Sequence, residues 1–161
     1  MHLGKKILVL IALFCLPLVL LSGYVTYAYI QAQNTLDKNF VRSFENKCGA
    51  NPHCTMNISE VTPFPWDTVY VFEAGETVDM ESVIGIPVPL LNEMSLRTVF
   101  LNEGRIVYAT TLPQDEEGNY VTKISYDIPQ EKRYKAYTNE TATIALNEHG
   151  RLQLFGEDVS K

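Results

Sequence analysis

Apolar residues are concentrated in one segment near the start of the chain, Ile7 to Ile30. Twenty of its 24 residues are apolar and none is charged, whereas polar and charged positions recur throughout the rest of the sequence. A helix of this length spans about 36 Å, at about 1.5 Å per residue, which is enough to cross a hydrocarbon core of about 30 Å. The pattern therefore predicts a membrane segment over residues 7–30, followed by a separate folded domain.

The residues that flank this segment indicate its orientation. Residues 1–6 include two lysines, and because positive charge stays on the cytoplasmic side, the domain that follows is expected to be exported. Three tyrosines lie near the far end, where their rings suit the membrane–water interface. These features favour a single-pass signal anchor in the inner membrane, with a cytoplasmic N-terminus and a periplasmic or extracellular domain. A cleaved signal peptide, with residues 7–21 as its apolar region, is the alternative.

Beyond residue 33 the apolar spacing becomes that of an amphipathic helix. Intervals of one, three and four residues place four side chains on one stripe: Leu36, Phe40, Val41 and Phe44. The pattern predicts a helix from Asn34 to Lys47, with Gly49 just past its end. This helix either continues from the membrane segment as a stalk over residues 31–47 or packs on a sheet.

Runs of β-branched and aromatic residues follow, separated by turn residues, and they predict strands. Thr68 to Phe72 has the composition of a buried central strand, and Pro63 and Pro65 keep the chain before it extended. A short helix is expected from Thr77, its cap, to Ile84, with Gly85 as its stop. Further strands are expected at residues 56–61, 96–101, 105–112, 120–128, 133–138, 141–146 and 151–155.

Together these elements predict an α+β domain over residues 48–161. Its strands are expected to form one twisted antiparallel sheet of four to six members, with one or two helices packed on a face. Turn residues at 102–104 and at 147–150 suit tight hairpins between the strands that flank them. A domain of this length is large enough to bury a core of its own.

Charge is distributed as unevenly as hydrophobicity. All 19 acidic residues lie beyond residue 33 together with 11 of the 13 basic ones, so the exported part carries 11 minus 19, or −8, against −6 for the whole chain. Nucleic-acid binding is not expected, because an acidic domain lacks the basic surface that phosphates demand. An acidic surface suits a protein partner, and a basic one in particular.

The two cysteines of the exported part, Cys48 and Cys54, enclose the turn-forming run Gly-Ala-Asn-Pro-His. Disulfides persist outside the cytoplasm, so these two residues are expected to be bonded to each other. Their spacing matches no common zinc pattern and lacks the Cys-x-x-Cys arrangement of redox catalysts. A structural disulfide is therefore favoured over a metal site or a catalytic redox pair.

Sequence motifs that carry catalysis are not found. The chain has no Gly-x-Ser-x-Gly nucleophile elbow, no His-Glu-x-x-His motif, no phosphate-binding loop and no dinucleotide fingerprint. Neither a cofactor nor a metal is expected, and we expect a protein without catalysis. The enzymatic alternative is a hydrolase of wall material that uses carboxylates, which requires a deep pocket holding two of them.

Two features are candidates for partner binding. Trp66, the only tryptophan, stands with Asp67 beside prolines and aromatics, and an exposed aromatic rim there could bind a partner. The alternative is that the ring packs in the core while Asp67 bonds nearby backbone N–H groups. The second feature is an acidic run that either meets a basic partner or forms a solvated helix start: Glu73, Glu76, Asp79 and Glu81.

A resemblance rests on the run Phe64 to Phe72, in which Trp-Asp leads into an aromatic strand, on Ile84-Gly85, and on the predicted hairpin Val99 to Tyr108. In these features the chain resembles small uncharacterised exported bacterial proteins over about a third of its length. The resemblance implies a single exported domain, anchored or lipid-linked, and it implies no catalytic residue. This chain departs from lipid-linked versions because it lacks a suitably placed cysteine.

These observations predict a non-catalytic binding protein held at the outer face of a bacterial inner membrane. Its most concrete form is an inhibitor or immunity protein against a toxin or hydrolase that acts in the envelope. The alternative is an accessory or scaffold subunit of an envelope membrane complex, in which the membrane segment itself makes the contacts.

Overall fold

A computed structural model of the chain describes residues 36–75, 78–89, 91, 94–112 and 122–160. The chain divides into two compact units, and the second, Leu36–Lys161, contains every described residue. The predicted membrane segment at residues 7–30 lies outside the described residues. Within them, no helix combines the length and the hydropathy that a membrane crossing needs.

The described chain begins with a helix over residues 36–48. The predicted apolar stripe of this helix is buried and belongs to the main core: Leu36, Phe40, Val41 and Phe44. Gly49 follows with a φ of +56° and donates its N–H to the Glu45 carbonyl at 3.0 Å, the left-handed arrangement that favours glycine after a helix. The predicted helix is confirmed over its described residues and ends one residue later, at Cys48.

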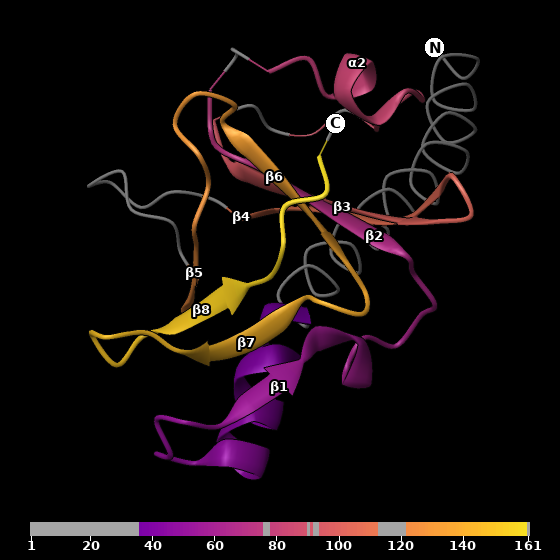
Figure 1. The fold of residues 1–161 in the computed structure, drawn as a ribbon. Helices are drawn as coiled ribbons and strands as arrows, with labels where there is room; N and C mark the ends of the chain where they lie inside the picture. The colour runs from indigo at the N-terminus through magenta and orange to yellow at the C-terminus, as the bar shows by residue number, and fades with distance from the viewer. Residues whose placement is uncertain (1–35, 76–77, 90, 92–93, 113–121, 161) are drawn as a thin grey trace, which may run out of the picture. The chain divides into compact units, whose positions relative to one another are not determined.

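Eight strands in the described part of the chain form two four-stranded sheets (Figure 1). Sheet A has the order β1 (Thr55–Asn57), β7 (Thr143–Leu146), β8 (Leu152–Phe155) and β5 (Ile124–Tyr126). Sheet B has the order β4 (Arg105–Leu112), β3 (Leu96–Asn102), β2 (Thr68–Phe72) and β6 (Tyr134–Thr138). A turn of 3-10 helix, Ile58–Glu60, follows β1.

The α+β class is confirmed, whereas the prediction of one antiparallel sheet of four to six strands is wrong. The hairpin of β3 and β4 belongs to sheet B, the hairpin of β7 and β8 belongs to sheet A, and β5 pairs with β8 in parallel. The physical reason is that alternation along a strand fixes which side chains are buried but leaves the neighbouring strand open. Strand β2 has the bounds that the sequence predicts and lies inside sheet B.

The main core lies between sheet B on one side and sheet A with helix 36–48 on the other. Val69, Val71 and Phe100 contribute from sheet B, and Met56 and Ile144 contribute from sheet A, all with at most 1% of their surface exposed. Full burial of such a side chain stabilises the fold by about 1.5–3 kcal/mol. This core therefore joins strands from both ends of the described chain.

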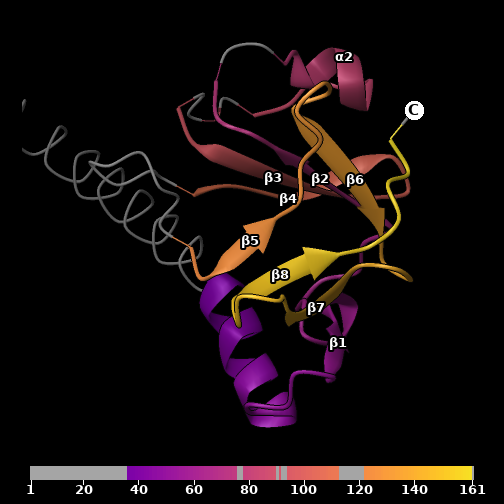
Figure 2. The ribbon, with the colours of Figure 1, turned by 60° about the vertical axis from the view of Figure 1, so that its left-hand side comes forward.

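A second apolar layer covers the other face of sheet B. It consists of residues 78–89 and 91, here termed the strap, which include helix α2 (Met80–Ile84). Figure 2 shows α2 on the side of sheet B that faces away from sheet A. The helix begins at Asp79, whose carboxylate accepts from the N–H groups of Glu81 and Ser82, so the prediction of Thr77 as cap is wrong. Gly85 ends α2 with a φ of +83°, as predicted.

Both long edges of sheet B are modified. On β4, the register shifts between Leu101, opposite Ile106, and Phe100, opposite Tyr108, which leaves Val107 as the extra residue of a bulge. On β6, the segment over residues 156–160 runs beside the strand. Bulges and covering segments are the usual means of protecting exposed strand edges from further pairing.

Candidate functional site

The structure places Trp66 in the core, so the alternative of core packing is confirmed and the surface rim is not. The indole is 4% exposed and meets the Phe100 ring edge to face, with the ring centroids 5.3 Å apart. Phe64 and Tyr108 extend the cluster, with their rings stacked at 5.1 Å. The aromatic residues around Trp66 therefore stabilise one end of the main core, and the indole is not available as a surface rim.

Asp67, just before β2, forms hydrogen bonds to the β3–β4 turn and to the turn after β6. Its carboxylate accepts from the Glu103 N–H in the β3–β4 turn, and its carbonyl accepts from the Asn139 N–H at 3.0 Å. The Asn139 amide also donates to the Trp66 carbonyl at 2.8 Å. Glu103 has a φ of +51°, so a fixed acceptor at its N–H supports a backbone conformation that is costly for a residue other than glycine.

The residues of the acidic run have separate contacts within the chain. Glu73 forms an ion pair with Arg133, with the Nε and Oε2 atoms 3.0 Å apart. Asp79 caps α2 and also accepts from the Ser82 hydroxyl at 2.7 Å. Glu81 accepts from the Val88 N–H at 3.2 Å, which ties helix α2 to the extended half of the strap. Glu76 lies outside the described residues.

Two arginines that were not predicted from the sequence bind the backbone carbonyls of the loop after β2. Arg97 donates through Nη2 to the carbonyls of Glu73 and Gly75 at 2.8 and 3.0 Å. Arg133 donates through Nη2 to the Ala74 carbonyl at 3.1 Å, so three successive carbonyls are bound by guanidinium groups. Arg97 is 2% exposed although it carries a charge. The available signal was an arginine within a strand of otherwise apolar and hydroxyl residues.

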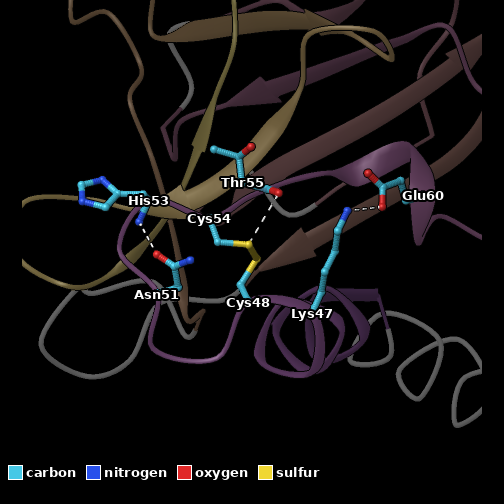
Figure 3. The surroundings of a disulfide bond; sticks show 7 residues. All are labelled: Lys47, Cys48, Asn51, His53, Cys54, Thr55 and Glu60. Atoms are coloured by element: carbon cyan, nitrogen blue, oxygen red, sulfur yellow. Dashed lines mark hydrogen bonds and ion pairs between the residues drawn. A yellow bond between two sulfur atoms is a disulfide. The ribbon is translucent and has the colours of Figure 1, made fainter.

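The predicted disulfide between Cys48 and Cys54 is confirmed (Figure 3). It joins the end of helix 36–48 to the residue before β1, and the turn between them is closed by Asn51, whose carboxamide oxygen accepts from the His53 N–H at 3.0 Å. Beside it, Lys47 and Glu60 form an ion pair of 2.6 Å. In the chain-entropy model, closing so short a loop stabilises the folded state by about 2 kcal/mol.

The enzymatic alternative requires a deep pocket that holds two carboxylates. A cavity of about 20 Å³ lies between the sheets, and no carboxylate lines it. Its walls are apolar apart from a threonine and a tyrosine: Phe40, Ile58, Val69, Val71, Thr98, Phe100, Ile124, Tyr126, Ile144 and Leu154. The described residues contain no group of three or more His, Cys, Asp and Glu placed to hold a metal ion.

Asp37, in the first described turn of helix 36–48, is a partly buried acid. Burial raises the pKa of its carboxyl, and this effect outweighs the hydrogen bonds from the Thr122 hydroxyl, at 2.8 Å, and from the Lys123 backbone, as well as the nearby Lys123 charge. The folded state therefore binds this proton more tightly than the unfolded chain does. Stability is expected to fall as the pH rises from the ordinary aspartate pKa through the raised one.

The variant Asp37→Asn is expected to reveal this titration. At a pH below both pKa values the wild-type carboxyl is protonated and uncharged, as the amide always is, whereas at neutral pH only the wild-type chain carries the buried charge. The unfolding free energy of the variant, relative to wild type, should therefore rise between about pH 3 and pH 7. Urea unfolding across this range measures the difference. A difference that is constant with pH would show that Asp37 titrates normally.

The strap presents apolar side chains that are only half-buried. Seven of them pack on the outer face of sheet B, and each keeps part of its surface exposed: Val78, Met80, Val83, Ile84, Ile86, Val88 and Leu91. Pro87 and Pro89 are exposed between them, and Met94, just after the strap, is 65% exposed. The charged neighbours Asp79 and Glu81 are exposed. The strap thus turns its apolar side chains toward sheet B, keeps part of each at the surface, and exposes Asp79, Glu81 and Ser82 beside them.

The comparisons with known proteins provide no relative for this chain. No protein-family model matches it, and neither a curated protein nor a solved structure does so. The fold and the surfaces described above therefore carry the functional argument.

Proposed function

We propose that the domain is a non-catalytic protein-binding module that is exported and held at the outer face of a membrane. The observation that carries this proposal is the strap, whose seven apolar side chains lie in one surface layer with none of them fully buried. Apolar side chains that stay partly exposed together, with charged residues beside them, are typical of a site for another protein. An inhibitor or immunity protein against an envelope-acting toxin or hydrolase is the most concrete form of such a module.

The charge around the strap supports a partner with a basic margin. Asp79 and Glu81 are exposed beside the partly buried apolar side chains of the strap, and residues 34–161 carry an overall excess of acids. Complementary charge at the margin of an interface mainly accelerates association and selects the partner, while the apolar centre supplies the affinity. The proposed partner therefore offers an apolar patch bordered by lysine or arginine.

The disulfide supports the proposed location. A Cys48–Cys54 bond persists in an oxidising compartment, such as the periplasm or the extracellular space. The uncharged apolar segment over residues 7–30 supplies the proposed single-pass anchor, with Lys5 and Lys6 on its cytoplasmic side. A tethered binding module would meet its partner where that partner acts on the envelope.

Site-specific photocrosslinking in intact cells tests the binding surface. A benzoyl-phenylalanine introduced at Val83, within the strap, is expected to give a discrete adduct with a protein partner. The same group at His149, whose side chain is 73% exposed in the β7–β8 turn, is the matched control and should give none. Equal adducts from both positions, or none from either, would contradict the proposal.

The charge of the margin is tested by a double variant, Asp79→Asn with Glu81→Gln. Asparagine is a good helix cap, and glutamine keeps an oxygen that can accept from the Val88 N–H, so the strap should fold as before. We expect the rate of adduct formation at Val83 to fall severalfold and to lose much of its dependence on salt. An unchanged rate would exclude a basic margin on the partner.

Replacing residues 1–33 with an unrelated anchor separates this function from the alternative of a scaffold subunit. A module that binds through the strap should give the same adduct after the replacement. A subunit whose contacts are made by its own membrane segment should lose its place in the complex.

A further inference from the structure

The segment over residues 156–160, here termed the edge segment, occupies the outer edge of β6. Figure 2 shows it leaving β8 and rising beside β6. The Val159 N–H donates to the Ala136 carbonyl at 3.0 Å, and the Ala136 N–H donates to a carboxylate oxygen of Asp158 at 3.3 Å. Both backbone polar groups of Ala136 are therefore satisfied by the edge segment.

The edge segment hydrogen-bonds to the edge of β6 as a neighbouring strand would, but it is not itself a strand. A paired strand would supply a backbone carbonyl to the Ala136 N–H, whereas here a side-chain carboxylate takes that place. No residue of the segment has strand structure, and Glu157 and Val159 are exposed. Along β6 itself the segment makes one backbone hydrogen bond and one side-chain substitute, which contribute less than a full ladder would.

Removal of the edge segment would take away the carboxylate that pairs with Lys132, whereas Lys135 keeps its own partner, Asp127. Lys132 lies 3.6 Å from the Asp158 carboxylate and donates to the Ser160 hydroxyl at 3.0 Å. Lys135, on β6 itself, is paired with Asp127 at 3.8 Å and has a side chain that is only 12% exposed. An extended chain placed on β6 would thus meet the Lys132 ammonium at the position that Asp158 occupies.

We infer that the edge of β6 is a strand-binding surface that accepts an extended acidic segment of a partner protein in place of the edge segment. The incoming chain adds to sheet B beside β6, with an N–H at the position of Val159 and a carboxylate near Lys132. Addition of a strand to a free sheet edge is a common mode of peptide recognition, in which backbone hydrogen bonds give the affinity. This surface is separate from the strap and does not depend on it.

The test uses the edge segment as its own probe. The full chain in detergent is shortened to end at Gly156, which keeps β8 and the glycine that packs against the Tyr137 ring. A fluorescent peptide of residues 156–161 is then titrated and followed by anisotropy. The shortened chain is expected to bind this peptide at least about tenfold more tightly than the unshortened chain does, because its own segment no longer competes.

Two altered peptides define what is recognised. An Asp158→Ala peptide should bind about tenfold more weakly, which is the effect expected for the loss of a hydrogen bond to a charged group. A peptide of the same composition in scrambled order should bind no better than background. If the shortened chain is folded and does not distinguish the native peptide from the scrambled one, the inference is wrong.

A second variant covers the case in which the shortened chain does not fold. Val159→Pro in the unshortened chain removes the N–H that bonds to Ala136 and leaves every other residue in place. This variant should bind the native peptide more tightly than the wild-type chain does. Equal binding by variant and wild type would overturn the inference.

Discussion

The variant Arg97→Ala is expected to lose about 3–5 kcal/mol of unfolding free energy, because it removes two hydrogen bonds from a charged donor, each worth about 1.5–3 kcal/mol. Arg97 is 2% exposed and donates to the carbonyls of Glu73 and Gly75, which are partly buried acceptors that would lose this donor. The space that it leaves adds a cavity under the start of the strap. Urea unfolding, followed by the fluorescence of the single tryptophan, measures the loss.

The control for this variant is Arg151→Ala. Arg151 is exposed in the β7–β8 turn, so its side chain should contribute less than about 0.5 kcal/mol. Arg97→Lys provides a further comparison, because lysine keeps the charge but cannot reproduce the planar guanidinium. We expect Arg97→Lys to be intermediate. A loss below about 1 kcal/mol for Arg97→Ala would show that the loop holds itself without the arginine.

Trp66→Ala is expected to destabilise the domain by about 3–5 kcal/mol, because it removes the largest ring of the aromatic cluster from a buried site. The ring is 4% exposed and packs edge to face on Phe100. Its neighbours are held in place by β3 and by the Asp67 contacts, so they cannot collapse into the space. Thermal unfolding followed by far-UV circular dichroism measures the change.

Phe64→Ala is the matched control for the tryptophan. The Phe64 ring belongs to the same cluster, stacked on Tyr108, but it is half-buried and borders solvent. Its removal should therefore cost clearly less than the removal of Trp66. Equal losses of unfolding free energy would mean that the half-buried Phe64 ring stabilises the cluster as much as the Trp66 ring does. The deeper burial of Trp66 would then add little stability.

The sequence predicted the elements whose signals are local. The stripe of helix 36–48 depends on a spacing of three to four residues, and β2 depends on a short run of β-branched and aromatic residues. Each signal is therefore contained in one short stretch of sequence. The β3–β4 hairpin is set by its own turn, where Gly104 has a φ of +70°. The disulfide was predicted from two cysteines only six positions apart, with turn-forming residues between them.

The division into two sheets could not be predicted in this way. Strand β1 pairs with β7, so that Thr55 lies opposite Ala145, and nothing in either strand identifies the other. The burial of Arg97 was equally hidden, because its acceptors are carbonyls of another loop and carbonyls leave no mark in a sequence. The sequence allows Trp66 either a core or a surface position, and only its neighbours in three dimensions distinguish the two.

The pairing of β1 with β7 also sets the order in which contacts can form as the chain emerges from its N-terminus during synthesis. Cys48 and Cys54 are six positions apart and can meet as soon as both have emerged. Sheet A, in contrast, must wait until β7 and β8 have followed, about ninety residues after β1. The disulfide can thus form well before sheet A, and the helix over residues 36–48 lacks its partners in sheet A until β7 and β8 have emerged.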